Sequence, residues 1–564
     1  MKFFETHKKY FFIAGALLLL FFAQNALAAN AGETINFNVD KNFDASNRTQ
    51  VTAALVKTAP KLYFYVEKTW WDLQVPAKKD EILAGFDSLS VEFDNKIYPI
   101  LTSVFGSEWK PGVDGDEKIT ILFQAMKEDA GGYFRTADEY IKLQLPDSNE
   151  REMLYLNISH IDSPQLKMFL AHEFVHLITF NQKEKKFDVQ EETWLDEGRA
   201  EFSSTILGYD DRYEGSNLQR RVKVFIENPS DSLTEWQNKK YDYSAVNIFF
   251  QYLADHFSVG VLIDSLKSKY VGIESLNYAL QKMGYKEDFS QIFTDWTLAV
   301  VLNDCSLDTK YCYLNKNLKN LRLAPSLNFL PLTGNVSLSV TNVTKNWTGT
   351  WLKFIGGNGD LTLDFSSLTG LNFAVPYIVE DSNKSSEIKY IVLDKSQKGK
   401  LNIKNFGKDY KSLIIIPSLQ TKISNFDGLE LTYPYTYSVE IKGGVVVEEQ
   451  VLIQQLIDRI AYLKAEIAKI LAQRSAGANG YCEQLNNNLY PGMANNNEVK
   501  CLQKFLKEQG IYAGLIAGNY GPLTRLAVVS FQEKYLVPLQ LSKTTGNVGP
   551  TTRVKINSFL TSGQ

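Results

Sequence analysis

Apolar residues recur at helical spacing in the first part of the chain and then give way to short extended segments. Residues 30–107 include the helix-like repeat at 82–89, so we expect a helical lead-in there. Residues 118–123 have the composition of a strand, and residues 131–135 and 153–158 are two further short extended segments. This order predicts a small sheet directly before the next helix.

A Ser-Pro pair at 163–164 is typical of a helix start, and a helix is predicted over residues 164–180. This helix carries His172, Glu173 and His176. Residues four apart lie on one face of a helix, so both imidazoles can reach one metal ion. The spacing is the His-Glu-x-x-His signature of zinc proteases, in which the glutamate serves as general base.

A catalytic zinc ion needs a third protein ligand and a site for water. The metzincin pattern is excluded, because Thr179 and Gln182 occupy the positions of its glycine and third histidine. A second helix is predicted over residues 193–202, where Glu197 and Glu201 share a face. We expect Glu197 to bind zinc and Glu201 to accept the other N–H of a ligating histidine.

Other polar residues near these helices have simpler interpretations. His160 is expected to be a surface or hydrogen-bonded residue and not a ligand. Asp196 is rotated off the ligand face, so it should cap the helix or form a pair. Asp188, Glu191 and Glu192 are expected to lie in a solvated loop.

The two-helix pattern resembles the gluzincin metallopeptidases, the thermolysin-like group with a downstream glutamate ligand. Residues 194–198 match its second-helix motif, and residues 131–134 with 153–156 look like its hyicolysin-type secreted members. The resemblance covers residues 60–300. It implies an α+β zincin-like metallopeptidase domain over residues 29–322, Zn²⁺ as cofactor, and a protein or peptide substrate.

The same resemblance implies a further catalytic residue. In this group a Tyr or His from the following helical lobe stabilises the oxyanion of the reaction intermediate. Tyr243 is the chosen candidate, and Tyr241 and His256 are its rivals. For all three residues the alternative interpretation is a packing or surface role.

The composition and the N-terminal residues indicate where in or outside the cell the protein is located. The chain has 564 residues and a formal net charge of −4, without a basic stripe interleaved with aromatics, so nucleic-acid binding has little support. Residues 1–28 have a basic start, an apolar core and a small-residue end, which predicts a cleaved secretory signal peptide. An uncleaved membrane anchor is the alternative, and no later membrane span is expected.

Four cysteines form two local pairs along the chain. In an exported protein we expect disulfides between Cys305 and Cys312 and between Cys482 and Cys501. The alternative is reduced, buried thiols.

Residues 323–445 change to period-two alternation with Gly- and Asn-rich turns, which predicts a β-sandwich without a catalytic constellation. Residues 446–474 carry a heptad seam of under three repeats. This segment would form a short coiled coil that dimerises the protein, or a helix that lies on its neighbour. Residues 475–481 are predicted to be a flexible linker.

The C-terminal part contains an internal sequence repeat, since the Gly-Asn-x-Gly-Pro pattern of residues 518–525 recurs at 546–553. Residues 482–564 resemble the small three-helix peptidoglycan-binding domain of cell-wall enzymes. The resemblance implies peptidoglycan as a partner and a bacterial exported protein held at the wall. The alternative is a helical bundle that binds no ligand.

Together these patterns predict a secreted, wall-associated zinc endopeptidase that acts on protein or on peptidoglycan peptides. The alternative function is a catalytically inactive wall-binding protein on a peptidase scaffold. The presence of Glu173 argues against that alternative, because a scaffold has no need of a general base.

Overall fold

The computed structural model describes residues 32–128, 130–332, 335–426, 428–442, 456–466, 484–512, 514–536 and 544–562. They belong to two compact units, Met1–Gln473 and Arg474–Gln564. The predicted signal peptide (1–28), the linker (475–481) and most of the predicted coiled-coil segment (446–474) lie outside the described residues.

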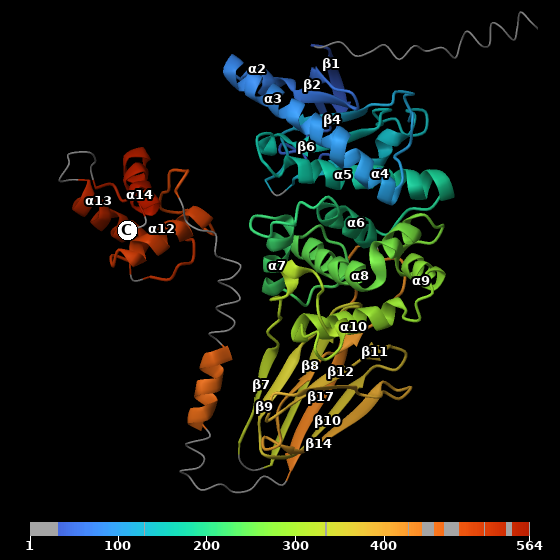
Figure 1. Ribbon diagram of the computed structural model, residues 1–564, viewed down its shortest axis with the longest axis vertical. Helices are drawn as coiled ribbons and strands as arrows, with labels where there is room; N and C mark the ends of the chain where they lie inside the picture. Colours follow the sequence, from blue (N-terminus) through green and yellow to red (C-terminus); the bar gives the residue numbers. More distant parts are fainter. Residues whose placement is uncertain are drawn as a thin grey trace, which may run out of the picture. The chain divides into compact units, whose positions relative to one another are not determined.

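The first unit begins with a six-stranded sheet in the order β1-β2-β3-β4-β6-β5 (Figure 1). Strands β3, β4 and β6 run parallel, and the short strand β5 pairs antiparallel with β6 at the sheet edge. The strands are β1 (Thr34–Asn38), β2 (Gln50–Thr58), β3 (Leu62–Glu67), β4 (Ile119–Gln124), β5 (Gly132–Phe134) and β6 (Met153–Asn157). The three segments predicted as extended are therefore β4, β5 and β6.

The helical lead-in predicted over residues 30–107 is wrong in its first half, which forms strands β1 to β3. Every residue of β3 is buried. A strand that is covered on both faces has a continuous apolar sequence without alternation, so periodicity cannot distinguish it from a buried helix. Helices follow only after β3, as α2 (Lys68–Asp72), α3 (Pro76–Glu92) and α4 (Tyr98–Phe105).

A layer of helices follows the sheet in sequence and packs on it through α5. Phe174 of α5 contacts Phe93 and Tyr98 from the preceding helices, with ring centroids 5.1 and 5.6 Å apart. In Figure 1 these helices, coloured from teal to yellow-green, lie between the first sheet and a second, β-rich region. The helices are α5 (Leu166–Phe180), α6 (Thr193–Ile206), α7 (Asn217–Glu227), α8 (Lys240–Leu266), α9 (Gly272–Lys282) and α10 (Phe289–Leu302).

Helix α8 is the one helix among the described residues that is long and apolar enough to cross a membrane. Its most apolar window is 56% buried inside the protein. The helix also bends at Ser258, whose φ is 67°. These features are those of a core helix in a folded domain.

The segments predicted as a β-sandwich form one nine-stranded sheet, which folds in two layers around a second apolar core. One layer has the order β8-β17-β10-β14, and the other contains β7, β9, β15, β12 and β13. The layers are joined by a single residue pair, Phe406 with Tyr410. The strands are β7 (Ser326–Leu330), β8 (Val336–Thr344), β9 (Leu352–Gly356), β10 (Gly359–Ser367), β12 (Pro376–Asp381), β13 (Ser386–Tyr390), β14 (Lys398–Phe406), β15 (Tyr410–Ile415) and β17 (Tyr433–Lys442), with the short pair β11 (Phe373–Ala374) and β16 (Ser418–Leu419).

The sandwich shares a hydrophobic core with the helical layer. Buried side chains therefore pack across the predicted domain boundary at 322/323. Trp347 lies against Phe289 and Phe293 of α10, with ring centroids 4.7 and 5.4 Å apart. The Trp351 indole N–H donates a hydrogen bond to the Thr297 carbonyl at 2.8 Å. The sandwich therefore supports the helices that follow the first sheet.

Trp347→Ala tests this shared core. Trp347 is 1% exposed, and removal of a buried Trp side chain costs about 3–5 kcal/mol of unfolding free energy. We expect the urea midpoint, measured by circular dichroism, to fall for the helical signal as well as for the strand signal. Leu431→Ala, at a side chain that is 72% exposed, is the control and should change the midpoint little. Loss of the strand signal alone would show that the two parts unfold separately.

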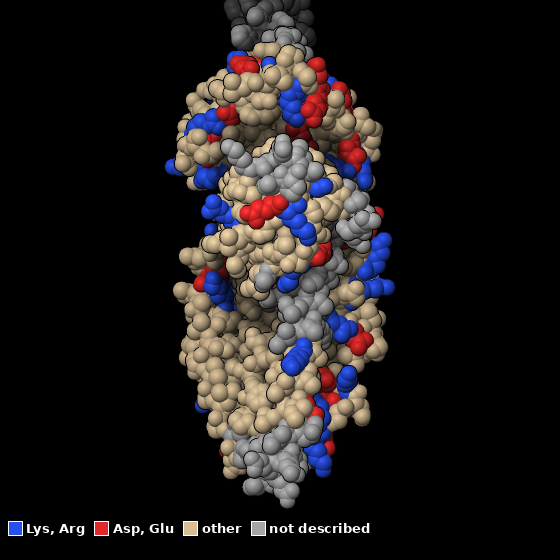
Figure 2. Space-filling model, turned by 90° about the vertical axis from the view of Figure 1, so that its left-hand side faces the viewer, with Lys and Arg blue, Asp and Glu red and all other residues tan. Residues whose placement is uncertain are grey.

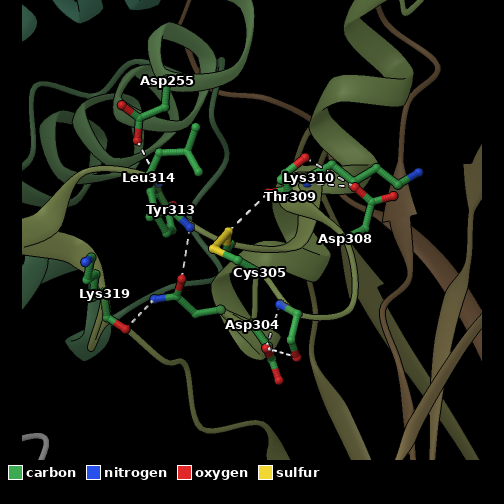
Figure 3. The surroundings of a disulfide bond; sticks show 12 residues. Asp255, Asp304, Cys305, Asp308, Thr309, Lys310, Tyr313, Leu314 and Lys319 are labelled. Atoms are coloured by element: carbon green, nitrogen blue, oxygen red, sulfur yellow. Dashed lines mark hydrogen bonds between the residues drawn. A yellow bond between two sulfur atoms is a disulfide. The ribbon is translucent and has the colours of Figure 1, made fainter.

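The disulfide predicted between Cys305 and Cys312 is confirmed. It closes a loop after α10 (Figure 3). The Tyr313 N–H, next to this loop, donates a hydrogen bond to the Asn303 side chain at 2.9 Å. Cross-link and hydrogen bond together hold the loop at the end of α10.

Residues 456–466 are helical and lie on the sandwich. The Arg459 guanidinium stands 4.9 Å from the Phe329 ring, and the Lys353 ammonium stands 5.8 Å from the Tyr462 ring. Of the two predicted alternatives, residues 456–466 therefore follow the second one, a helix that lies on a neighbouring part of the chain. Dimerisation through the rest of the segment stays a prediction.

The described residues of the second unit form three helices, α12 (Asn497–Glu508), α13 (Pro522–Tyr535) and α14 (Pro550–Ser562), around a small apolar core, as predicted. The two copies of the sequence repeat, at 518–525 and 546–553, make equivalent hydrogen bonds. Gln503 accepts a hydrogen bond from Gly518 N, and Gln532 accepts one from Gly546 N, each at 2.9 Å. Cys501 on α12 is disulfide-bonded, while its predicted partner, Cys482, lies outside the described residues.

Both charge signs are mixed on the face of the protein that Figure 2 shows. On the face in Figure 2, Lys and Arg side chains stand among Asp and Glu side chains, and neither sign forms a continuous area among the described residues. The same mixture is expected from 60 basic and 64 acidic residues.

Candidate metal centre

Helices α5 and α6 bring two histidines and a glutamate together. One ligand atom from each of His172, His176 and Glu197 lies within 4.8 Å of the others. Glu197 Oε2 is 3.0 Å from His172 Nε2 and 3.6 Å from His176 Nε2. The three groups predicted as zinc ligands therefore face one point, from two helices that are adjacent in sequence.

Two further carboxylates lie on the outer sides of the histidines. Asp196 Oδ2 is 2.8 Å from His176 Nδ1, within hydrogen-bond range. Glu201 Oε1 is 3.7 Å from His172 Nδ1, which is ion-pair distance and longer than a hydrogen bond. Asp196, expected to cap or pair, thus pairs with His176, one of the two predicted ligand histidines.

Glu201 has its own set of donors. Arg221 of α7 donates to it from Nε at 2.7 Å and also from Nη2, and Asn217 donates at 3.0 Å. Asn247 of α8 donates at 3.3 Å. Burial raises the pKa of Glu201, but Arg221 outweighs burial and lowers it. Glu201 is therefore an ionised carboxylate that two further helices hold beside His172.

The electrostatics of the centre favour charged carboxylates beside the imidazoles. Burial lowers the pKa of His176, but Asp196 and Glu197 outweigh it and raise that pKa well above its usual value. Burial also raises the pKa of Glu197, yet the two histidines hold it well below its usual range. The centre therefore has an ionised oxygen donor between two imidazole nitrogens.

The donor set fits a zinc ion. Two imidazole nitrogens and one carboxylate oxygen are ligands that Zn²⁺ prefers, and catalytic sites use three protein ligands with one open position. Asp196 at Nδ1 of His176 directs that ring's Nε2 toward Glu197, which is the orientation that a ligating histidine needs.

Glu173 lies between the centre and the edge strand of the sheet. It is 5% exposed, and burial raises its pKa to about 7 in spite of the nearby histidines. A Cβ on Gly132 of β5 would lie 3.0 Å from Glu173 Oε1 and 2.6 Å from the Tyr155 carbonyl oxygen. Glycine at 132 therefore lets the edge strand approach the carboxylate closely.

Tyr243 of α8 is brought to the centre, and its rival His256 is not. Its ring is 6.4 Å from the His172 ring, and its hydroxyl donates to Asn238 at 2.6 Å. Burial and then Glu197 raise its pKa well above 10, so the hydroxyl keeps its proton. His256 instead contacts the Cys312 carbonyl at 2.9 Å, near the disulfide, and Tyr241 lies under Lys240.

His160 lies against the Phe169 ring, 4.9 Å away, and takes no part in the three-ligand cluster. Asp188 is exposed, as expected. The expectation of a solvated loop is wrong for Glu191, which is 8% exposed and pairs with Arg199 at 2.8 Å. The basic partner lies on the following helix, so the loop sequence alone gave no signal of burial.

Three contributors to the site were missed or left open by sequence reasoning. Arg221 and Asn247 hold Glu201, and Gly132 admits the edge strand. These residues are distant in sequence from the two-helix motif. A glycine pair in a short extended segment was visible at 131–132, but its contact with Glu173 depends on tertiary structure.

Asp196→Asn tests the role of the carboxylate behind His176. We expect zinc affinity to fall about 10- to 100-fold, because such outer partners fix the orientation and basicity of a ligand histidine. Competition with a chromogenic chelator measures the Kd. Asp188→Asn, at an exposed loop position, is the control. Equal affinity of Asp196→Asn and the unmodified protein would remove Asp196 from this role.

One comparison with known proteins identifies a domain within the second unit. Residues 495–556 match the family model of the peptidoglycan-binding domain. No curated protein matches the chain. One solved structure, a periplasmic lysozyme inhibitor from Aeromonas hydrophila, is 10% identical over 21% of this chain and 100% of that chain, with a TM-score of 0.15.

A second solved structure, the pre-peptidase C-terminal domain of a collagenase from Bacillus anthracis, is 9% identical over 21% of this chain and 96% of that chain, with a TM-score of 0.14. Scores this low support no inference about fold or activity. The informative match is the family model. Residues 495–556 are a peptidoglycan-binding domain, which indicates that this chain interacts with the cell wall.

Proposed function

We propose that this protein is a secreted, wall-associated zinc-dependent endopeptidase of the gluzincin type. The observation that carries the proposal is the convergence of His172, His176 and Glu197, with Glu173 beside them. A metal-binding scaffold needs the three ligands. Glu173 is the buried fourth group. Its pKa of about 7 suits a general base, which peptide hydrolysis requires in addition to the ligands.

The chain's own residues supply binding, orientation and proton transfer. His172, His176 and Glu197 would hold the zinc ion, which when bound activates water and polarises the scissile carbonyl. Glu173, with a pKa near 7, takes a proton from the attacking water and gives it to the leaving amine. Tyr243, which keeps its hydroxyl proton, donates a hydrogen bond to the developing oxyanion.

The edge strand offers a way to hold an extended peptide. Strand β5 pairs with β6 on one side and ends the sheet on the other. A substrate chain can add to such an edge through main-chain hydrogen bonds. Because Gly132 brings β5 against Glu173, a peptide on this edge would lie next to the proposed general base.

Two measurements test the proposal. Metal analysis of protein purified without a chelator should give about one zinc per chain. Incubation with casein and with purified sacculi, followed by detection of new amino groups, tests hydrolysis and separates protein from peptidoglycan peptides as substrates. Zinc-free protein that cleaves neither substrate would overturn the proposal and leave the runner-up, a wall-binding protein without activity, which rests on the match at residues 495–556.

A further inference from the structure

A second cluster of acidic side chains lies at one end of the first sheet, apart from the histidine centre. Glu139 follows β5 in a short 3-10 turn, and Glu152 directly precedes β6. These two side chains are 1% and 3% exposed. Asp114 belongs to the loop before β4 and is open to solvent.

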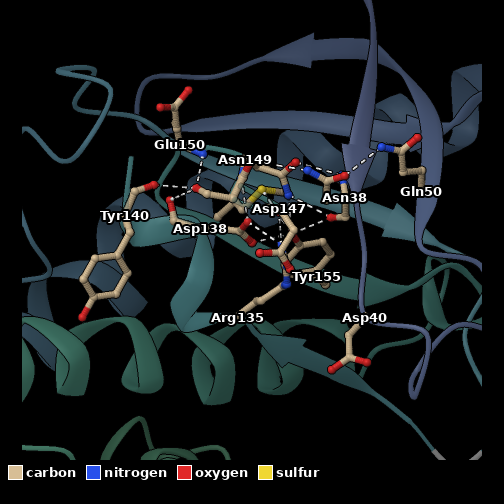
Figure 4. A network of polar contacts seen from close by, with 12 residues as sticks. Asn38, Asp40, Gln50, Arg135, Asp138, Tyr140, Asp147, Asn149, Glu150 and Tyr155 are labelled. Atoms are coloured by element: carbon tan, nitrogen blue, oxygen red, sulfur yellow. Dashed lines mark hydrogen bonds and ion pairs between the residues drawn. The ribbon is translucent and has the colours of Figure 1, made fainter. Parts of the chain in front are cut away.

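Asp138, the residue before Glu139, shows how a buried carboxylate in this region is paired with hydrogen-bond donors. Asp138 is fully buried and accepts hydrogen bonds from Arg135 at 2.9 Å, from Asn149 N at 2.9 Å and from the Tyr155 hydroxyl at 2.5 Å (Figure 4). Glu139 is the next residue, yet no N–H or hydroxyl donor among the described residues bonds either of its oxygens. A buried ionised carboxylate without a partner is costly.

Glu139 faces other acids instead of donors. Its carboxyl group lies within hydrogen-bond range of Glu152, which in turn lies within hydrogen-bond range of Asp114. Burial, and then the neighbouring carboxylates, raise the pKa of Glu139 and that of Glu152, the latter to about 8. A cation between these groups would remove the repulsion and satisfy their free oxygens.

The loop before β4 closes over the pair. Val113 N donates to Glu152 Oε1 at 2.7 Å, while no donor among the described residues bonds Glu152 Oε2. Gly112 has a φ of +89°, and a Cβ there would lie 1.8 Å from Glu152 Oε2. The main chain thus packs directly on the carboxylate, and the exposed Asp114 marks the opening to solvent.

We propose that Asp114, Glu139 and Glu152 form a binding site for a hard divalent cation, Ca²⁺. The donors are all oxygens, which suit calcium and not the nitrogen-rich preference of zinc. Calcium accepts irregular geometry with 6–8 ligands at about 2.3–2.6 Å, so main-chain carbonyls and water can complete the shell. Among the described residues the histidine centre alone has three ligand atoms within 4.8 Å, so the ion would draw Asp114 inward.

The consequence is structural. A cation held by Glu139 and Glu152 would clamp the connection between β5 and β6 at its two ends, and Asp114 would fasten the preceding loop to it. Edge strand β5 gains little support from its single neighbour. The ion would therefore fix the strand that lies against Glu173.

The test uses the full chain, passed over a chelating resin and reloaded with one equivalent of ZnCl₂. Calorimetric titration with CaCl₂ should show one site per chain, and CaCl₂ at 100 times the Kd should raise Tm by about 3–5 °C. Glu139→Gln should lose both effects. Before CaCl₂ is added it should be at least as stable as the unmodified protein, because a buried acidic group without a hydrogen-bond donor is gone. Glu117→Gln, whose side chain is 75% exposed, is the matched control and should keep both effects.

An unchanged Tm and no heat of binding for the unmodified protein would overturn the proposal, and would show that the carboxylates simply share a proton. An equal calcium response of Glu139→Gln would also overturn it. MgCl₂ should give a smaller shift, because Mg²⁺ demands regular octahedral geometry. An equal shift from both ions would overturn the assignment to Ca²⁺. None of these readouts uses hydrolysis or needs zinc to bind, so failure here and failure of the proposed peptidase activity are distinguishable.

Discussion

Glu173→Gln is expected to keep zinc and to lose hydrolysis. Gln has nearly the same shape as Glu but cannot accept a proton from water, and a general base contributes roughly 10²- to 10⁴-fold to a rate. We expect kcat/KM on casein to fall by that factor while zinc content stays at about one per chain. Gln at 173 also removes a buried carboxylate whose pKa burial raises to about 7, so the variant should fold.

The control for Glu173→Gln is Glu81→Gln, at a side chain that is 64% exposed on α3. It should retain full activity. Activity of Glu173→Gln close to that of the unmodified protein would exclude Glu173 as the base. Loss of zinc together with activity would instead show that the residue serves to maintain the metal centre.

Glu197→Gln is expected to lose zinc. Its carboxylate oxygen stands 3.0 and 3.6 Å from the two imidazole nitrogens, and a neutral amide oxygen is a much weaker ligand. The fall in zinc affinity should exceed the roughly 10- to 100-fold effect typical of a partner outside the ligand set, such as Asp196. Metal analysis after gel filtration and the chelator competition assay measure this loss.

Glu227→Gln provides the comparison for Glu197→Gln, because Glu227 is 46% exposed and pairs with Lys240 on the surface. It should bind zinc normally. If Glu197→Gln bound zinc as tightly as this control, the third ligand would have to be another group. Asp196 is the nearest alternative carboxylate, since it contacts His176 at 2.8 Å.

The spacing of His172, Glu173 and His176 was sufficient to predict one helix and one shared face. Helical geometry is local, so residues four apart meet whatever surrounds them. The next helix, with Glu197, follows a short connection, and its placement was also predictable. The three-helix second unit was predictable for a similar reason, because its repeated turns precede two of its helices.

Strand β3 and the acid cluster show where such reasoning fails. Strand β3 is covered on both faces, so its sequence lacks the alternation that identifies a strand. Glu139 and Glu152 are ordinary acidic residues in sequence, separated by a loop. Their burial side by side results from the pairing of β5 with β6, which is a long-range contact.

The amino-acid sequence by itself thus determined the two helices that carry His172, His176 and Glu197, the Cys305–Cys312 disulfide and the peptidoglycan-binding domain, because each depends on neighbours within a few turns or on a short repeat. The tertiary structure decided which carboxylate contacts which histidine, the approach of Gly132 to Glu173, and the continuous core between helices and sandwich. These contacts join segments that are distant in sequence, and their energies arise only when both sides are buried together.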